Sequence, residues 1–275
     1  MKAVLVYRAP QFSPNSVKKD QAILEAVGEE LRQRGAQVSY VQEEDLLDDC
    51  EADVYLTMSR LPETLALLRR KEEQGRVVVN STRGIEMATT RSQVDRLMRE
   101  SNIPTAPLCD HDTGAEGYWL KRGDAAAQSL YDVQFAATWN DVERKLGYFH
   151  QRGIDDVLIM EHIDGDVVKF YGVQGTSFFR CYYPTDDGQT KFGDEQHNGA
   201  AHHYNFSEQQ LHEDADKLSR LADVKVYGGD CIVRRDGTYA VIDFNDWPSF
   251  ARCREEAAQA IVQALCGQVQ AITEK

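Results

Sequence analysis

The chain has 275 residues, of which 42% are hydrophobic and 28% are charged, and its formal net charge is −14. This composition is typical of a globular protein, and no apolar run is long enough for a membrane-spanning helix. The acidic balance argues against nucleic acid or an anionic membrane as a partner, because both attract basic surfaces. Six cysteines without a CxxC pair indicate free thiols in a reducing compartment, so we expect a cytoplasmic protein.

The first hundred residues alternate between strand and helix patterns. Short apolar runs predict strands, and the segments between them show helical periodicity, which together indicate a βαβ series and a parallel sheet. No GxGxxG follows the first strand, so a dinucleotide-binding site has little support. The strands are expected at residues 3–7, 37–41, 53–58 and 76–80, and the helices at 17–34 and 62–74.

A linker follows this first segment. Asn80-Ser81-Thr82 is a helix-capping sequence that predicts a short helix, and a second helix is expected at residues 91–101. Pro104 and Pro107 end that helix, because proline lacks the backbone donor and restricts the residue before it. We therefore place the first domain boundary after residue 106.

The remaining chain changes to an antiparallel style. Strands at 118–122 and 133–137 are expected to form one hairpin, and a polar segment at 184–205 has the length of a lid or binding loop. The other elements expected here are helices at 140–151, 207–221 and 252–272 and strands at 157–163, 167–173 and 178–183.

The most informative stretch is the hairpin from Gly228 to Pro248. Asp236-Gly237 predicts a two-residue turn, and counting outward from that turn places Asp230 opposite Asp243. Two carboxylates that face each other across a ladder repel, and a bound cation with oxygen ligands would remove the repulsion.

Asn245 lies two residues beyond Asp243, so both side chains project from one face of the strand. Gly228 would lie opposite Asn245 and leave open space above the sheet. We interpret the hairpin as a metal and nucleotide site. The alternative is that these residues, which are common turn formers, only end the strand.

Five sequence fragments stand in a characteristic order along the chain: Asn80-Ser81, Ile103-Pro104, Trp119-Leu120-Lys121, Met160-Glu161-His162-Ile163-Asp164-Gly165-Asp166 and Ile242-Asp243-Phe244-Asn245-Asp246-Trp247-Pro248-Ser249. In this order they resemble the ATP-grasp superfamily, which includes glutathione synthetase and D-alanine–D-alanine ligase. The resemblance covers nearly the whole chain, and it implies a mixed α/β and α+β fold. A Rossmann-like pre-ATP-grasp domain with a linker helix would occupy residues 1–106, and two α+β lobes at 107–163 and 164–275 would enclose ATP.

The resemblance implies ATP and Mg²⁺ as cofactors and assigns a role to each motif. Phosphate contacts would come from Arg91 and Lys121, adenine contacts from the hinge residues Glu161, His162 and Ile163, and ribose contacts from Asp166. The metal would be held by Asp230, Asp243 and Asn245. The transferred phosphoryl group or the substrate would be stabilised by Lys169 and Arg180, and the substrate would be contacted by Ser249 and Arg252.

Two departures from the superfamily pattern concern the phosphates. The expected flap, residues 122–130, has one glycine, although a backbone cradle for phosphates favours glycine. Asp243 stands where the superfamily has a glutamate, which shortens the arm that reaches the metal. Both departures bear on catalytic rate more than on nucleotide binding.

The function implied is an ATP-dependent carboxylate–amine ligase that forms ADP through an acylphosphate. Its partners would be small-molecule carboxylate and amine substrates, and a homodimer is left open. Two alternatives stay open: a small-molecule kinase of the inositol-phosphate kinase type, and a nucleotide-binding module without turnover.

Overall fold

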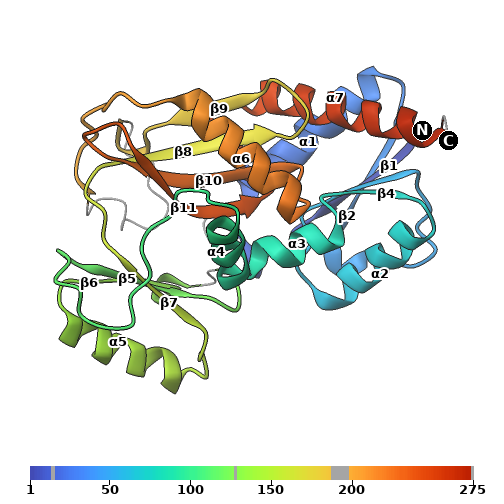
Figure 1. Ribbon diagram of the computed structural model, residues 1–275. Helices are drawn as coiled ribbons and strands as arrows, with labels where there is room; N and C mark the ends of the chain where they lie inside the picture. The colour runs from blue at the N-terminus through green and yellow to red at the C-terminus, as the bar shows by residue number, and fades with distance from the viewer. Residues whose placement is uncertain (14–15, 127–128, 187–197, 274–275) are drawn as a thin grey trace.

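Three β-sheets follow one another along the chain (Figure 1). The computed structural model describes residues 1–13, 16–126, 129–186 and 198–273. The strand orders are β2-β1-β3-β4, β6-β5-β7 and β11-β10-β8-β9. Each sheet falls within one of the three segments expected to be domains, although the division into domains itself stays a prediction.

The first sheet is parallel throughout, as the βαβ pattern predicted. Strands β1, β3 and β4 are buried because α1 covers one face of the sheet and α2 the other, whereas the edge strand β2 is only partly buried. The elements are β1 (Lys2–Tyr7), α1 (Val17–Gln33), β2 (Gln37–Gln42), β3 (Val54–Thr57), α2 (Pro62–Glu73) and β4 (Val77–Val79).

Two short helices connect this sheet to the next one. Ser81 begins the first of them, because its Oγ accepts a hydrogen bond of 3.0 Å from Gly84 N, as the capping sequence predicted. The two helices are α3 (Thr82–Thr89) and α4 (Arg91–Glu100).

The second sheet has a helix on one face only. Burial alternates along β7, because one set of side chains packs under α5 and the other set faces the third sheet. The elements are β5 (Tyr118–Arg122), β6 (Val133–Ala136), α5 (Trp139–Gln151) and β7 (Val157–Glu161), with β5 and β6 paired as the expected hairpin.

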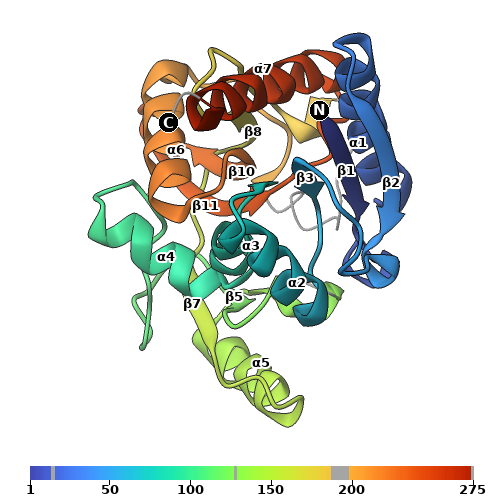
Figure 2. The same ribbon diagram turned by 90° about the vertical axis from the view of Figure 1, so that its right-hand side faces the viewer.

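The third sheet is antiparallel. Helix α6 lies across one face, and α7 packs against α1 of the first segment, as Figures 1 and 2 show. The elements are β8 (Asp166–Val173), β9 (Phe179–Tyr182), α6 (Glu208–Ala222), β10 (Val226–Val233), β11 (Tyr239–Asp246) and α7 (Arg254–Thr273).

A single hydrophobic core joins the first sheet to the third. It contains Leu5 and Leu24 from the first segment together with Trp247, Phe250 and Ile261 from the last. Burial of such large side chains stabilises by about 1.5–3 kcal/mol each, so the two sheets hold a fixed relation to each other. None of the described helices is long and apolar enough to cross a membrane.

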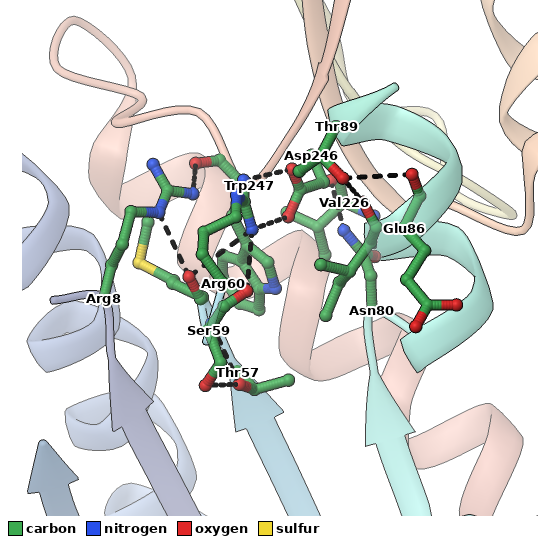
Figure 3. Close-up of polar contacts among 12 residues, drawn as sticks. Arg8, Thr57, Ser59, Arg60, Asn80, Glu86, Thr89, Val226, Asp246 and Trp247 are labelled. Atoms are coloured by element: carbon green, nitrogen blue, oxygen red, sulfur yellow. Dashed lines mark hydrogen bonds and ion pairs between the residues drawn. The ribbon is translucent and has the colours of Figure 1, made fainter. Parts of the chain in front are cut away.

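Asn80 adds a polar link between the same two sheets. Its Nδ2 donates to Val226 O at 2.9 Å, and its Oδ1 accepts from Val226 N at 2.8 Å, so the side chain imitates a strand pairing (Figure 3). Both residues are almost fully buried. The amide therefore satisfies two backbone groups that water does not reach.

We expect Asn80→Ala to lower the free energy of unfolding by about 2 kcal/mol, because a buried donor and acceptor lose their partner. The urea midpoint of the variant measures the loss. Asn140→Ala, at an exposed position on α5, is the control and should leave the midpoint unchanged. Equal midpoints for the two variants would contradict the structural role of Asn80.

Candidate functional site

A cavity of about 620 Å³ is lined by residues of the second and third sheets and by segments that follow β1 and β3 of the first sheet. Among the described residues, seven cationic and six acidic side chains line it, so this described lining carries slightly more positive than negative charge. The whole chain, by contrast, carries a net charge of −14. Cations concentrated in a cleft of an acidic protein favour an anionic ligand at that place.

The third sheet places two carboxylates side by side in this cavity. Asp230 pairs with Asp243 across β10 and β11, and Gly228 pairs with Asn245, which confirms the predicted pairing. Asp230, Asp243 and Asn245 all line the cavity.

The pairing arises by a different route from the one predicted. The turn has three residues, because Arg234 N donates to Thr238 O at 2.8 Å, and Gly237 closes it at a φ of +85°. The three-residue turn shifts the pairing register of β10 and β11 by one residue next to the turn. A bulge at Ile242 of β11 restores the predicted register from Asp230 onward.

Gly228 does not leave the open space that was expected. A Cβ there would lie 2.8 Å from Pro248 Cγ and 2.9 Å from Tyr171 Cδ1. The glycine instead lets these two side chains approach the strand, and both of them line the cavity.

Neighbouring cations balance the paired carboxylates. Lys169 Nζ lies 3.0 Å from Asp230 Oδ1, and Arg91 Nε lies 3.5 Å from Asp243 Oδ1. Burial alone would raise the pKa of Asp243, but the charges of Arg91 and Lys121 outweigh it and hold that pKa below its usual value. Asp243 is therefore ionised at neutral pH.

Lys121 is buried at the base of the cavity. Its Nζ donates to Ile242 O at 2.7 Å, so the bulged residue supplies the acceptor. Burial lowers the pKa of Lys121 to about 8; Asp243 acts in the opposite direction, and Arg91 adds to the lowering. The Lys121 ammonium therefore loses its proton just above neutral pH.

Arg91 has an unsatisfied donor in the same place. Its Nη1 donates to Arg122 O at 2.9 Å, but its Nε is buried without a hydrogen-bond partner among the described residues. An anion that entered beside Asp243 would satisfy that donor.

The hinge residues Glu161, His162 and Ile163 line the cavity at the end of β7. Trp119 Nε1 donates to His162 Nδ1 at 3.1 Å, which requires the neutral histidine to carry its proton on Nε2. The two rings and the hinge backbone form one wall that suits a flat aromatic ligand.

The structure does not bring Asp166 to the cavity. Its buried carboxylate accepts hydrogen bonds from His202 N at 2.7 Å and from Tyr204 N at 2.9 Å. Asp166 is absent from the described cavity lining, because it anchors the returning segment after residue 198. This placement argues against the expected ribose contact.

Arg180 also lies elsewhere. It forms an ion pair with Glu256 of α7 and is not among the described residues that line the cavity. It lies on the edge strand β9, and its guanidinium contacts the neighbouring helix α7. This position does not support its expected contact with the transferred phosphoryl group.

The expected substrate residues Ser249 and Arg252 do line the cavity. They follow β11 in a segment where Trp247 and Phe250 are fully buried and have φ values of +41° and +46°. Bulky residues rarely adopt such angles, and the surrounding core holds them there.

Sequence reasoning missed the contribution of the first segment to the cavity. Arg8 and Arg60 follow β1 and β3, and Arg60 binds Asp246 through two nitrogens (Figure 3). The available signal was a charged residue directly after β1 and another three positions beyond the end of β3, because ligands bind at the carboxyl ends of such strands.

Two expected loops fall partly outside the described residues. Residues 127–128 belong to the predicted flap, and residues 187–197 belong to the predicted lid. Of the described parts, Asp124, Ala125, Ala126, Ser129 and Leu130 line the cavity from the predicted flap, and Pro184 and Asn198 line it from the predicted lid segment.

No protein-family model and no curated protein matches the chain. Solved structures do match over nearly the full length of both chains. A RimK-domain ATP-grasp protein from Sphaerobacter thermophilus aligns with a TM-score of 0.69 at 14% identity, covering 97% of this chain and 100% of that one. The D-alanine–D-alanine ligase from Coxiella burnetii aligns at 0.66 and 11% identity, covering both chains completely. The D-alanine–D-alanine ligase from Bacillus anthracis complexed with ATP aligns at 0.65 and 9% identity, covering 98% and 99%.

ADP can serve as an anionic probe of the cavity, and if it binds beside Lys121, the lowered pKa of Lys121 predicts how its affinity depends on pH. Below pH 8 the ammonium is charged before the ligand arrives, so affinity does not vary through this group. Above pH 8 the ligand must bind together with a proton, and affinity should fall by up to about tenfold per pH unit. Titration calorimetry of ADP from pH 7 to 9.5 measures the slope.

Lys121→Arg is the matched variant, because a guanidinium stays charged throughout this range. Its affinity for ADP should not decline above pH 8. A decline of the same slope in both proteins would assign the titration to another group.

Proposed function

Starting from the ATP-grasp fold of this chain, we propose that it is an ATP- and Mg²⁺-dependent ligase that joins a carboxylate to an amine. The observation that carries this proposal is the charge arrangement on one wall of the cavity. Asp230 and Asp243 face each other, and Lys121, Lys169 and Arg91 surround them. Such alternation of charge suits a metal-bound polyphosphate.

ATP would lie between the second and third sheets. The hinge Glu161–Ile163 would contact adenine, with Trp119 and His162 forming the adjoining wall. Lys121 and Arg91 would contact the phosphates, since one is a buried ammonium and the other has a buried unsatisfied Nε. The ribose contact stays unassigned.

Asp230, Asp243 and Asn245 fit Mg²⁺ in chemistry, because all three offer oxygen atoms on one face of the hairpin. The described residues contain no group of three or more His, Cys, Asp or Glu that could hold a metal by itself. The phosphates and water would therefore supply the other ligands. When bound, the ion would neutralise charge on the β- and γ-phosphates.

The reaction would begin when a carboxylate oxygen of the acid substrate attacks the γ-phosphorus of ATP. The bond to the β-phosphate oxygen breaks, ADP leaves, and an acylphosphate remains. The amine nitrogen then attacks the acyl carbon, phosphate leaves, and the nitrogen loses a proton. Lys169 would stabilise the transferring phosphoryl group, and Ser249 and Arg252 would orient the acid.

The experiment is hydroxylamine trapping, because hydroxylamine replaces the unknown amine and converts any acylphosphate into a hydroxamate. A panel of carboxylates is incubated with ATP and Mg²⁺, and hydroxamate and phosphate are measured together. We expect equal amounts of both with at least one acid. Phosphate transfer to an alcohol without hydroxamate would indicate a kinase, and binding without phosphate release would indicate a nucleotide-binding module.

We expect ATP to raise the thermal midpoint of the protein mainly when Mg²⁺ is present. A ligand at a hundredfold excess over its dissociation constant contributes about 2.7 kcal/mol of stability. Asp243→Asn should remove most of the Mg²⁺-dependent part, because one of two charged metal ligands is lost, while the protein stays folded.

Asp236→Asn is the control on the same hairpin. It lies in the exposed turn, where asparagine is also favoured, and it should keep the full stabilisation by Mg²⁺ and ATP. Equal stabilisation of all three proteins would remove Asp243 from the metal site.

A further inference from the structure

Two arginines of the first sheet reach the cavity at the end of β11. Arg8 and Arg60 follow the neighbouring strands β1 and β3, and both line the cavity. Their side chains are only 11% and 10% exposed. Figure 3 shows the two guanidinium groups side by side above the ends of these strands.

Each guanidinium keeps donors beyond its contacts with the described residues. A guanidinium carries five N–H groups. Arg8 donates to Met58 O and Asp20 Oδ2, both at 3.1 Å, and reaches Trp247 O only at 3.5 Å. Arg60 donates to the Asp246 carboxylate through Nη1 and Nη2, and its Nη1 also donates to Ser59 O at 2.9 Å.

Arg8, Arg60 and Lys19 line this end of the cavity together with Asp20 and Asp246, so its described lining has one more cation than anion. Burial and the neighbouring charge of Arg60 lower the pKa of Arg8, whereas Asp20, Asp246 and Glu43 raise it. Lys19 and Ser16, from the start of α1, line the same cavity. The side chain of Ser16 makes no capping hydrogen bond, and a helix N-terminus attracts negative charge.

Glu43 positions both arginines without lining the cavity. Its carboxylate is 1% exposed and accepts hydrogen bonds from the backbone N–H groups of Ala9, Arg60 and Leu61. One buried side chain thus ties the loop after β1 to the loop after β3.

The distance to the phosphate end follows from β11. Asp246, which holds Arg60, lies three residues beyond Asp243, and a strand advances about 3.3 Å per residue. The two ends of the cavity are therefore about 10 Å apart along this strand. A small molecule with two anionic groups can span that distance.

We infer that Arg8 and Arg60 bind a second carboxylate of the acid substrate, one that is not activated. The inference rests on the proposed ligase function and names its substrate class as dicarboxylic acids. Two adjacent planar guanidinium groups match the planar shape of a carboxylate better than they match an anion that acts as a point charge.

The first experiment measures binding without ATP, so that it does not depend on turnover. The probes are succinate, glutarate, adipate, pimelate and suberate, each compared with the monocarboxylate of the same carbon number. We expect at least one dicarboxylate to bind about ten to a hundred times more tightly than its partner, as one additional charged contact implies. Equal affinities throughout the series would overturn the inference.

The second experiment uses Arg8→Lys, which keeps a positive charge beside Asp20 but loses the planar fork. We expect its affinity for the preferred dicarboxylate to fall about tenfold or more and its affinity for the monocarboxylate to stay unchanged. Arg34→Lys is the matched control, because Arg34 also binds a carboxylate, Glu30, with two nitrogens, but on the surface. If Arg8→Lys bound the dicarboxylate as tightly as the unaltered protein, Arg8 would not contact the substrate and would only link the first sheet to the third.

The hydroxamate assay separates this inference from the proposed function. If the inference holds, Arg8→Lys raises the KM of the dicarboxylate while kcat changes little, because the second carboxylate is bound equally in the ground state and the transition state. Dicarboxylate binding without any hydroxamate would contradict the ligase function alone. Hydroxamate formed equally from monocarboxylates would contradict the dicarboxylate inference alone.

Discussion

Strand β11 is the element on which the site depends, because it runs through the cavity and carries groups for both of its ends. Asp243 and Asn245 face the proposed metal and phosphates, and Asp246 holds Arg60 of the first sheet. The bulge at Ile242 of β11 brings Asp230 of the neighbouring strand β10 into register with Asp243. A slip of one residue between these two strands would turn the acidic side chains away from the cavity.

The paired carboxylates explain why so many cations gather in an acidic protein. Two like charges across a ladder are destabilising, and here Lys169 and Arg91 offset them. The same cations are suited to phosphate, so the charges that permit the free protein to fold also prepare it for its ligand. A metal would take over the role of counter-charge at the carboxylates and release the cations toward the phosphates.

Local sequence patterns predicted most of the elements because each pattern depends on neighbouring residues. The pairing of Asp230 with Asp243 was predicted correctly although the turn was not, because the three-residue turn and the bulge cancel. Neither feature has a signal that counting along the chain can detect. Asp166 and Arg180 lie outside the described cavity lining for a different reason: they contact a returning loop and α7, and neighbouring residues in the sequence do not signal such long-range contacts.

The shared core fixes one end of the cavity relative to the other. The first and third sheets are joined by α1, α7 and Trp247 in one hydrophobic cluster, so the arginine end and the carboxylate end keep a constant spacing along β11. The second sheet packs its own core under α5 and meets the rest through a smaller cluster around Met160 and Ile163. Under the proposed function, the nucleotide would therefore lie against the wall with the smaller shared cluster, whereas the acid substrate would meet a preorganised end.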